Sequence, residues 1–390
     1  MPVGLGELAR LESLPWFVVE RGSSDHTHLG GLNELKTLSN LRGVLQIVNL
    51  GHVSGSKMLS PTSLAYTIGR EANLKEKIHL ETLSLCWDDG NSAKEMEEWA
   101  AYLEGCEDVQ WDESMLESLQ PHSNLKFLSV SGHKGRRLTS WICSLTQLVS
   151  LQLVWCNVHH NLHHLQGLPN LQKLNLFGLI ELEYMDEGDD EDVDGWAMNE
   201  GAQKKTSKLF FPSLIELCLI DCPQMKGWRR KPHQFPKLSI LDITGCPLLT
   251  SMPSFPTLDR KLKLMNSSIL PLLDTLTMLP VGQINLPSSA TCSSSSLAPS
   301  SPSEVEALQY PLSKLKKLYL WRIDYLPKEW LQGMQHLTSL QEIRIDECLG
   351  LEETLYWHNI SHVPNIRIYG AYIKKGGVAQ QCPADTTGNL

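Results

Sequence analysis

The chain has 390 residues, 42% of them hydrophobic, which is enough apolar surface for a continuous core and excludes wholesale disorder. With 34 basic and 44 acidic residues, its net charge is −10, which argues against nucleic acid as the main partner. No apolar run approaches the eighteen residues or so that a membrane span needs.

The first predicted elements lie in the N-terminal 119 residues. Residues 17–19 are predicted to form a strand, and Leu11 and Leu14 before it already show a spacing that recurs further along. We therefore expect the complete protein to continue upstream, because an exposed first repeat leaves an apolar edge in water. Helices are predicted over residues 62–79 and 92–119, where helix-favouring residues predominate.

A pattern of the form L-x-x-L-x-L dominates the chain from residue 80 onward. It begins at Leu148 and again, 23 residues later, at Leu171. Nine matches begin at Leu80, Leu125, Leu148, Leu171, Leu214, Leu238, Leu315, Leu340 and Val363. This period and pattern are typical of leucine-rich repeats, in which each unit supplies one short strand and a return segment.

The fold class follows from the alternation of side chains along a strand. The two inner leucines of each phrase point into the array, and stacked units bury them in one continuous core. We predict an α/β leucine-rich-repeat solenoid, a horseshoe with a parallel β-sheet on its concave face and irregular or short helical returns on its convex face.

Four cysteines occupy the position where such repeats place Asn or Cys. They are Cys156, Cys222, Cys246 and Cys348. We expect a residue such as Cys156 to sit inside the turn and to donate weakly to the backbone of the neighbouring coil. The N-terminus lacks the layout of a secretory signal peptide and no paired C-x-x-C blocks occur, so all 10 cysteines are interpreted as reduced thiols. We expect a cytoplasmic protein, with a nuclear location or membrane association through partners as the alternatives.

Two insertions interrupt the repeats. The first, about 183–208, begins with eight carboxylates in twelve residues, which should repel one another and stay solvated. The second, about 266–310, contains a Ser-rich run that is typical of a flexible loop. We predict one leucine-rich-repeat domain over residues 1–370, with about 10–12 irregular repeats, and a disordered tail over residues 371–390.

Several segments resemble a known family beyond their repeat spacing. EANLKEKIHLETLSLCWDD (71–89), MLESLQPHSNLKFLSVSGHKG (115–135), LTSWI (138–142), FPSLIELCLIDCPQM (211–225) and LTSLQEIRIDECLGLE (337–352) are similar to parts of plant disease-resistance proteins. Over roughly residues 1–370, the chain resembles the leucine-rich-repeat region of a coiled-coil, nucleotide-binding, leucine-rich-repeat (NB-LRR) immune receptor.

The resemblance implies a module of an intracellular receptor. In such a receptor the repeats sense a pathogen effector or its host target, and they hold a nucleotide-dependent switch inactive. The chain lacks the G-x-x-x-x-G-K-[ST] phosphate loop, so ATP or ADP is expected only in a nucleotide-binding domain that this sequence does not contain. We expect no cofactor in this chain and protein partners only, with no nucleic acid among them.

The residues between the leucines are the candidate partner-binding residues, because solenoids use the concave face for extended recognition. Aromatic and arginine side chains are the usual energetic anchors of such surfaces. The predicted set is Trp87, Gln152, Trp155, Asn175, Phe177, Lys317, Tyr319, Trp321, Arg344, Arg367 and Tyr369. The alternative for each of them is packing against neighbouring strands without a binding role.

Other motifs favour structural interpretations. In HHNLHH, His159 and His163 are four residues apart, as are His160 and His164, but the cluster lies in a return segment and no carboxylate adjoins it, so no metal site is predicted. The acidic run lacks the spacing of a hand-type calcium loop.

The sequence also lacks a catalytic constellation. Neither G-x-S-x-G nor H-E-x-x-H occurs, so we do not expect an enzyme. The preferred hypothesis is a recognition and autoregulatory module in plant defence. The alternative is a substrate-recruiting adaptor of a ubiquitin-ligase complex, although residues 1–30 do not resemble an F-box.

Overall fold

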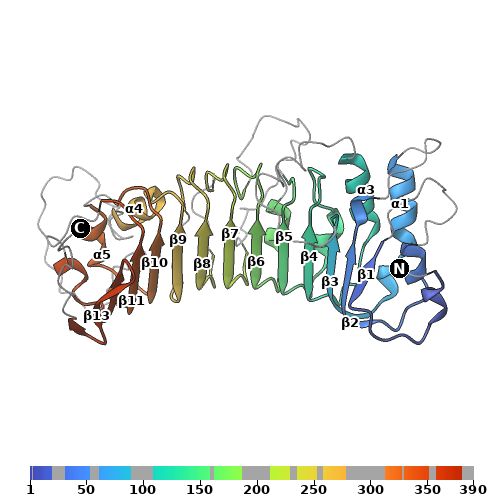
Figure 1. Cartoon of the computed structure of the whole chain (residues 1–390), viewed down its shortest axis with the longest axis horizontal. Helices are drawn as coiled ribbons and strands as arrows, with labels where there is room; N and C mark the ends of the chain where they lie inside the picture. Colours follow the sequence, from blue (N-terminus) through green and yellow to red (C-terminus); the bar gives the residue numbers. More distant parts are fainter. Residues whose placement is uncertain are drawn as a thin grey trace, which may run out of the picture.

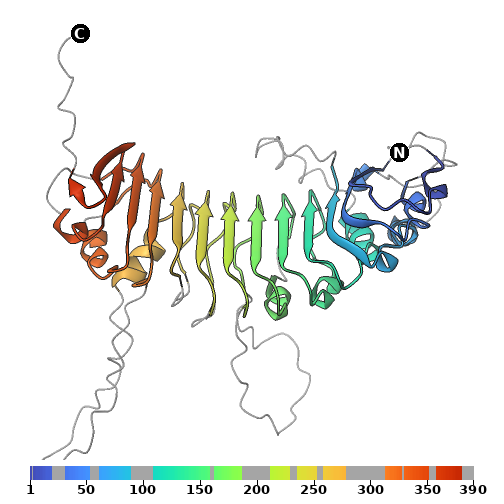
Figure 2. The same ribbon diagram turned by 90° about the horizontal axis from the view of Figure 1, so that it is seen from below.

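The computed structural model describes residues 1, 3–19, 31–52, 61–88, 109–158, 162–186, 211–228, 235–252, 258–277, 312–326, 329–350 and 357–379. They form an elongated, gently curved solenoid with a row of strands along one side and most of the short helices along the other (Figure 1, Figure 2). Within these ranges, no helix is long and apolar enough to cross a membrane.

One sheet of 14 strands runs the length of the molecule, and its strands lie side by side in chain order. They are β1 (Trp16–Val18), β2 (Arg42–Val48), β3 (His79–Cys86), β4 (Phe127–Ser131), β5 (Ser150–Val154), β6 (Lys173–Phe177), β7 (Glu216–Ile220), β8 (Ile240–Thr244), β9 (Lys261–Met265), β10 (Lys317–Trp321), β11 (Glu342–Asp346), β12 (Asn365–Ile368), β13 (Ala371–Lys375) and β14 (Val378–Ala379). From β1 to β12 every pairing is parallel, which confirms the predicted solenoid.

Many of the returns between strands contain short helices, whereas the described parts of the returns from β6 to β9 contain none. The α-helices are α1 (Pro61–Glu71), α3 (Val109–Ser118), α4 (Leu270–Thr277) and α5 (Glu329–Met334), and the 3-10 helices are η1 (Leu5–Glu7), η2 (Leu32–Leu35), η3 (Leu50–His52), η4 (Leu74–Glu76), η5 (Ser140–Ser144), η6 (Leu162–Gly167) and η7 (Trp357–Ile360). The helix predicted over 62–79 is shorter, because α1 ends at Glu71 and Asn73, with a positive φ, separates it from η4. Of the helix predicted over 92–119, the part before residue 109 lies outside the described residues.

The repeated leucines form the core, as their spacing predicts. Leu151 pairs in register with Leu174, and Leu153 pairs with Leu176, and all four side chains are buried. The same two inner positions are buried and apolar in the strands on either side. A leucine at such a site contributes about 2–5 kcal/mol relative to alanine, so the stacked rows hold the coils together.

A residue with positive φ follows most of the strands. It occurs after β2 and after every strand from β4 to β12. These residues are Asn49, Gly132, Trp155, Gly178, Asp221, Gly245, Asn266, Arg322, Glu347 and Tyr369. In this left-handed conformation the chain turns out of the sheet while its N–H still reaches the next coil: Trp155 donates to Phe177 O at 2.7 Å, and Gly178 donates to Ile220 O at 2.8 Å.

The turn places the repeat cysteine inside the coil. Cys156 is fully buried, and its Sγ donates to Val130 O of the preceding coil at 3.4 Å, as predicted. Cys246 makes the corresponding contact with Leu219 O at 3.9 Å. Burial raises the pKa of the Cys156 thiol to about 12, so it remains a protonated donor at physiological pH.

Strand β9 is a coil that the sequence pattern did not predict. It pairs in parallel with β8 and β10, and Leu262 and Leu264 occupy the two inner positions. The preceding leucine, Leu258, is four residues before Leu262 instead of three, which breaks the L-x-x-L-x-L phrase. Helix α4 also occupies the beginning of the predicted Ser-rich insertion. The rest of that insertion, and the acidic insertion after residue 186, lie outside the described residues.

The predicted disordered tail is wrong for its first nine residues. Strand β13 pairs antiparallel with β12, and β14 pairs antiparallel with β13. Gly376 and Gly377 connect β13 to β14, with φ values of 59° and 84°. Two consecutive residues with positive φ form the turn that matches the twist of a two-residue hairpin. Residues 380–390 lie outside the described residues.

Replacing Gly178 with alanine should lower the free energy of unfolding by about 3 kcal/mol, because strain at positive φ adds to overpacking. At this position φ is 62°, and an added Cβ overlaps the ring of Trp155. At Gly43 φ is also positive, at 72°, but nothing lies within 4 Å of an added Cβ. Gly43→Ala should therefore cost only about 1 kcal/mol. Urea denaturation of the two variants measures the difference, and equal losses would contradict the packing of Trp155 on Gly178.

Folding stability should fall in mild acid because of His133. Its ring is fully buried and meets Trp87 edge-on, with ring centroids 4.8 Å apart. Burial lowers the pKa of His133 from 6.5 to about 4. Below pH 6.5 the unfolded chain therefore binds a proton that the folded chain does not, and stability falls by about 1.4 kcal/mol per pH unit until about pH 4.

The measurement compares the wild-type chain with His133→Gln, which cannot take up this proton. Between pH 7 and pH 4, the wild type should lose about 3 kcal/mol more free energy of unfolding than the variant. If the two proteins lose the same amount across this range, His133 is not the responsible group.

Candidate interaction surface on the concave face

The outward side chains of the strands form three rows across the sheet, because the strands pair in register. Numbered along the five-residue strands, they are the first, third and fifth rows. The first row is Val44, Thr82, Phe127, Ser150, Lys173, Glu216, Ile240, Lys261, Lys317, Glu342 and Asn365, and the third is Gln46, Ser84, Ser129, Gln152, Asn175, Cys218, Asp242, Lys263, Tyr319, Arg344 and Arg367. The fifth row includes Val154, Phe177, Ile220, Thr244, Met265, Trp321 and Asp346.

The N-terminal half of this face is mostly uncharged. From β2 to β6 the third row holds uncharged polar side chains that are partly exposed, including Gln152 and Asn175 on two adjacent strands. The exception in the first row is an ion pair, in which Lys173 Nζ lies 3.0 Å from Glu216 Oε2. This half therefore offers hydrogen-bonding groups without a strong electrostatic field.

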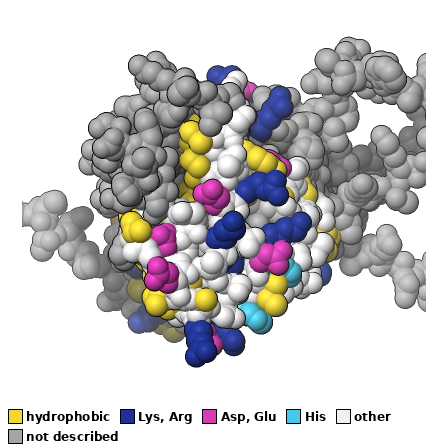
Figure 3. Space-filling model, turned by 90° about the vertical axis from the view of Figure 1, so that its right-hand side faces the viewer, with side chains coloured by type: hydrophobic (Ala, Val, Ile, Leu, Met, Phe, Trp, Pro, Cys, Tyr) yellow, Lys and Arg dark blue, Asp and Glu magenta, His cyan; other side chains and the backbone are white. Residues whose placement is uncertain are grey.

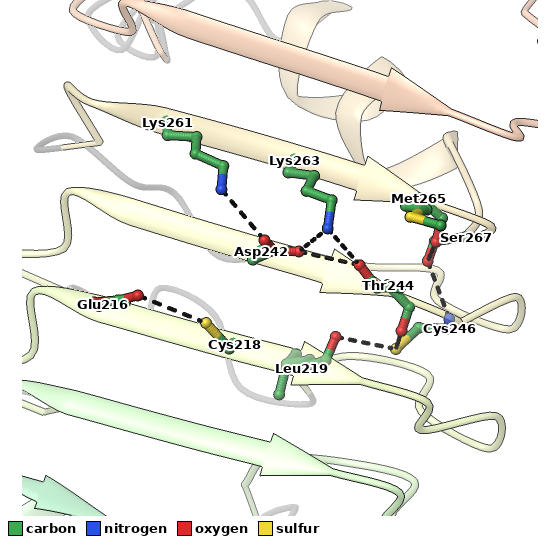
Figure 4. A network of polar contacts seen from close by, with 10 residues as sticks. All are labelled: Glu216, Cys218, Leu219, Asp242, Thr244, Cys246, Lys261, Lys263, Met265 and Ser267. Atoms are coloured by element: carbon green, nitrogen blue, oxygen red, sulfur yellow. Dashed lines mark hydrogen bonds and ion pairs between the residues drawn. The ribbon is translucent and has the colours of Figure 1, made fainter. Parts of the chain in front are cut away.

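From β8 onward the face is charged, and Asp242 is the first centre of that charge. Lys261 Nζ lies 3.4 Å from its carboxylate and Lys263 Nζ lies 3.2 Å from it, so both lysines of β9 converge on one acid (Figure 4). Lys263 also donates to Thr244 Oγ1 at 3.3 Å, and that hydroxyl donates to Asp242 Oδ1 at 3.1 Å. The arrangement fixes two lysine side chains on the sheet.

Glu342 is the second centre. It accepts hydrogen bonds from Arg344 Nε at 2.6 Å and from Tyr319 OH at 3.0 Å, and Lys317 Nζ lies 3.6 Å away. Burial opposes ionisation, but the hydrogen bonds from Arg344 and Tyr319 outweigh it and hold the pKa of Glu342 below its usual value. The Arg344 guanidinium lies 4.9 Å from the centroid of the Tyr319 ring, a cation–π distance.

The fifth row is largely apolar. Val154, Phe177, Ile220 and Met265 are partly exposed along it, and Trp321, beside Asp346 of the next strand, is 42% exposed. Below this edge, a cleft of about 430 Å³ is lined by α4 and by the turn after β10, including Leu270, Leu273 and Tyr325. An apolar row beside charged rows is the composition of a protein interface rather than of a small-molecule pocket.

Nine of the eleven predicted binding residues lie where the sequence placed them, with outward side chains that are at least partly exposed. They are Gln152, Asn175, Phe177, Lys317, Tyr319, Trp321, Arg344, Arg367 and Tyr369. The fold brings Lys317, Tyr319 and Arg344 together around Glu342. Gln152, Asn175 and Phe177 form a separate group on β5 and β6.

The placement of Trp87 and Trp155 on the concave surface is wrong. Each follows its strand at a position that continues the inward side of the two leucines, and each side chain is buried. Trp87 packs against His133, and the ring of Trp155 covers Gly178. They stabilise the coil, and they are not available to a partner.

Sequence reasoning missed Lys261, Lys263 and Met265, because it did not predict β9. The signal is present in Leu262 and Leu264, whose alternation is that of an inward-facing pair. A search for L-x-L preceded by leucine at three or four residues finds this coil.

The N-terminal end of the solenoid has no comparable concentration of charge. Acidic and basic side chains are interspersed there with hydrophobic ones (Figure 3). Trp16 of β1 is exposed at this end. The segregation of charge is thus a property of the β8–β12 part of the sheet.

No group of three His, Cys, Asp or Glu side chains is arranged for a metal ion among the residues that the structure describes. His159 and His160 lie outside them, as do the side chains of His163 and His164. The prediction that this cluster binds no metal therefore stays a prediction.

The sequence of the repeats is similar to that of known proteins. Residues 32–179 match the family model of R13L1/DRL21 leucine-rich repeats. The putative disease resistance protein RGA1 of Solanum bulbocastanum is 30% identical over 244 residues, which cover 61% of this chain and 20% of that protein. The putative disease resistance RPP13-like protein 1 of Arabidopsis thaliana is 26% identical over 235 residues, which cover 54% of this chain and 20% of that protein.

The chain thus spans about a fifth of the length of the curated relatives that it matches. Among solved structures, an internalin from Listeria monocytogenes aligns with 94% of this chain and 88% of its own, at 14% identity and a TM-score of 0.34. The sequence matches to resistance proteins, together with the repeated coils, establish the relationship. The leucine-rich repeats of this chain are homologous to those of plant disease resistance proteins.

Proposed function

We propose that this chain is the recognition and autoregulatory module of an intracellular plant immune receptor. Its concave face binds a pathogen effector or a host target, and the same repeats bind the nucleotide-binding domain of the receptor. The module has no catalytic role of its own, and ATP or ADP belongs to the nucleotide-binding domain. Homology to plant disease resistance proteins supports the biological setting.

One observation carries the proposal: the outward surface of the sheet presents side chains that do not pack in the hydrophobic core. Tyr319 and Trp321 of β10 project from the sheet on either side of the buried Leu320, among charged groups that are held in place. Exposed aromatic and arginine side chains in fixed positions are typical anchors of protein interfaces. Because their geometry is set before binding, association costs less conformational entropy.

The mechanism is a shift between two states of the receptor. In the resting state the repeats contact the nucleotide-binding domain, and an effector that binds the released repeats more tightly favours release. A tenfold preference for the released state corresponds to about 1.4 kcal/mol, which sets the scale of differential binding that the concave face must supply.

The double variant Tyr319→Ala/Trp321→Ala should weaken association with a nucleotide-binding region by at least tenfold, because each anchor contributes about 1–2 kcal/mol. The region is taken from a related resistance protein and expressed as a separate polypeptide, and calorimetry measures the affinity. The melting temperature should fall by no more than about 4 °C, because the variant loses the hydrogen bond from Tyr319 to Glu342, which contributes about 1 kcal/mol.

A matched control removes an aromatic side chain from a return helix. Tyr66 of α1 is 43% exposed, close to the 42% of Trp321. Tyr66→Ala should leave the affinity within about twofold. In leaves, the wild-type chain should suppress cell death caused by an autoactive nucleotide-binding region, and the β10 variant should suppress it less. Unchanged affinity and unchanged suppression in the β10 variant would refute the proposal.

A further inference from the structure

We infer that the β9–β12 part of the concave face is a docking site for an acidic segment of a protein partner. The site consists of Lys261, Lys263, Lys317, Arg344 and Arg367, and these five residues are named the basic patch below. The inference rests on the proposed function, because it specifies the chemistry of the partner that the concave face binds.

The patch has more positive than negative charge. The first and third rows of β8–β12 contain five basic side chains and two carboxylates, Asp242 and Glu342. Four of the basic side chains pair with these acids, and Arg367 Nε donates to Gly370 O at 3.1 Å. The fifth row of these strands adds Asp346, whose Oδ1 accepts a hydrogen bond from the Gly370 N–H at 2.6 Å. A local excess of positive charge on a chain whose net charge is −10 requires an explanation beyond average composition.

The two carboxylates lie below the cations. The Asp242 side chain is 13% exposed and that of Glu342 is 16% exposed, whereas Lys317 and Arg344 are 49% and 39% exposed. An approaching partner therefore meets ammonium and guanidinium groups first. The recessed acids reduce repulsion among the cations and hold them across neighbouring strands, so little side-chain entropy remains to be lost on binding.

The dimensions of the patch fit a short extended peptide. Neighbouring strands are about 4.8 Å apart, so β9 to β12 span about 14 Å, the length of four or five extended residues. Carboxylates at alternate positions of such a peptide are about 7 Å apart on one side, and two or three of them match the excess charge. Arg344 and Arg367 lie in register on adjacent strands and offer planar donor groups that suit carboxylates.

A protein segment fits better than nucleic acid. A polynucleotide extends well beyond 14 Å and would meet the acidic remainder of a chain with a net charge of −10. A short acidic stretch confines its charge to the patch. Tyr319 and Trp321 beside the lysines also provide apolar contacts for the side chains that flank the acidic residues.

The test uses the full chain and two fluorescein-labelled decapeptides, one of alternating Glu and Ser and one of alternating Gln and Ser. Fluorescence anisotropy at low salt should show binding of the Glu peptide and at least tenfold weaker binding of the Gln peptide. Raising the salt from about 20 to about 200 mM shortens the electrostatic screening length roughly threefold. Binding of the Glu peptide should therefore weaken severalfold.

Lys263→Gln/Lys317→Gln should weaken binding of the Glu peptide at least tenfold. Both recessed carboxylates remain paired in this variant, Asp242 with Lys261 and Glu342 with Arg344, so the fold should persist. The control Lys75→Gln/Lys126→Gln removes the same charge from exposed positions away from the patch and should change the affinity less than twofold.

Three results would overturn the inference. They are equal weakening by the two double variants, equal binding of the Glu and Gln peptides, and tighter binding of a single-stranded oligonucleotide of matched charge. The last result would assign the patch to nucleic acid. If the peptide test fails while the β10 aromatic variant still loses its association, only the acidic-segment inference falls. If both fail, the proposed function falls with it.

Discussion

The left-handed residue at the end of nearly every strand is the constraint on which the solenoid depends. At this point the chain leaves the sheet, yet its N–H still bonds to the following coil, as from Trp155 to Phe177. For a residue other than glycine this conformation costs about 1–2 kcal/mol, which burial and the hydrogen bond to the next coil offset. Because every strand from β4 to β12 is followed by the same turn, these strands keep one register from coil to coil.

Because the strands are in register, the inward side chains of each strand form the core and the outward side chains form the surface. Inner residues such as Leu174 are alike from coil to coil because they share one core, whereas outward residues differ freely. The concave face therefore has two different halves. The half around Gln152 and Asn175 is neutral, and the half around Asp242 and Glu342 is charged. Charged groups on the sheet are held by neighbours from adjacent strands, so the repeat that builds the core also positions the recognition residues.

Much of this was predictable from spacing, and the exceptions have physical causes. The spacing of the L-x-x-L-x-L phrases predicts the fold and most of the outward residues, because strand geometry fixes the alternation of side chains. It missed β9, where Leu258 precedes Leu262 by one residue too many, and it misplaced Trp87 and Trp155, which continue the inward side beyond the strand. The pairing of Lys261 and Lys263 with Asp242 joins residues of different repeats, which a linear pattern does not reveal.

The C-terminal hairpin has a consequence for the behaviour of the protein in solution. A parallel sheet that simply stopped at β12 would present a row of unpaired N–H and C=O groups to other molecules. Strands β13 and β14 cover that row by running antiparallel, and the new edge is the two-residue strand β14, beside which lie Lys374 and Lys375. An edge strand of two residues, flanked by two lysines of β13, is a poor template for a second sheet. The solenoid therefore carries its own protection against edge-to-edge aggregation at this end.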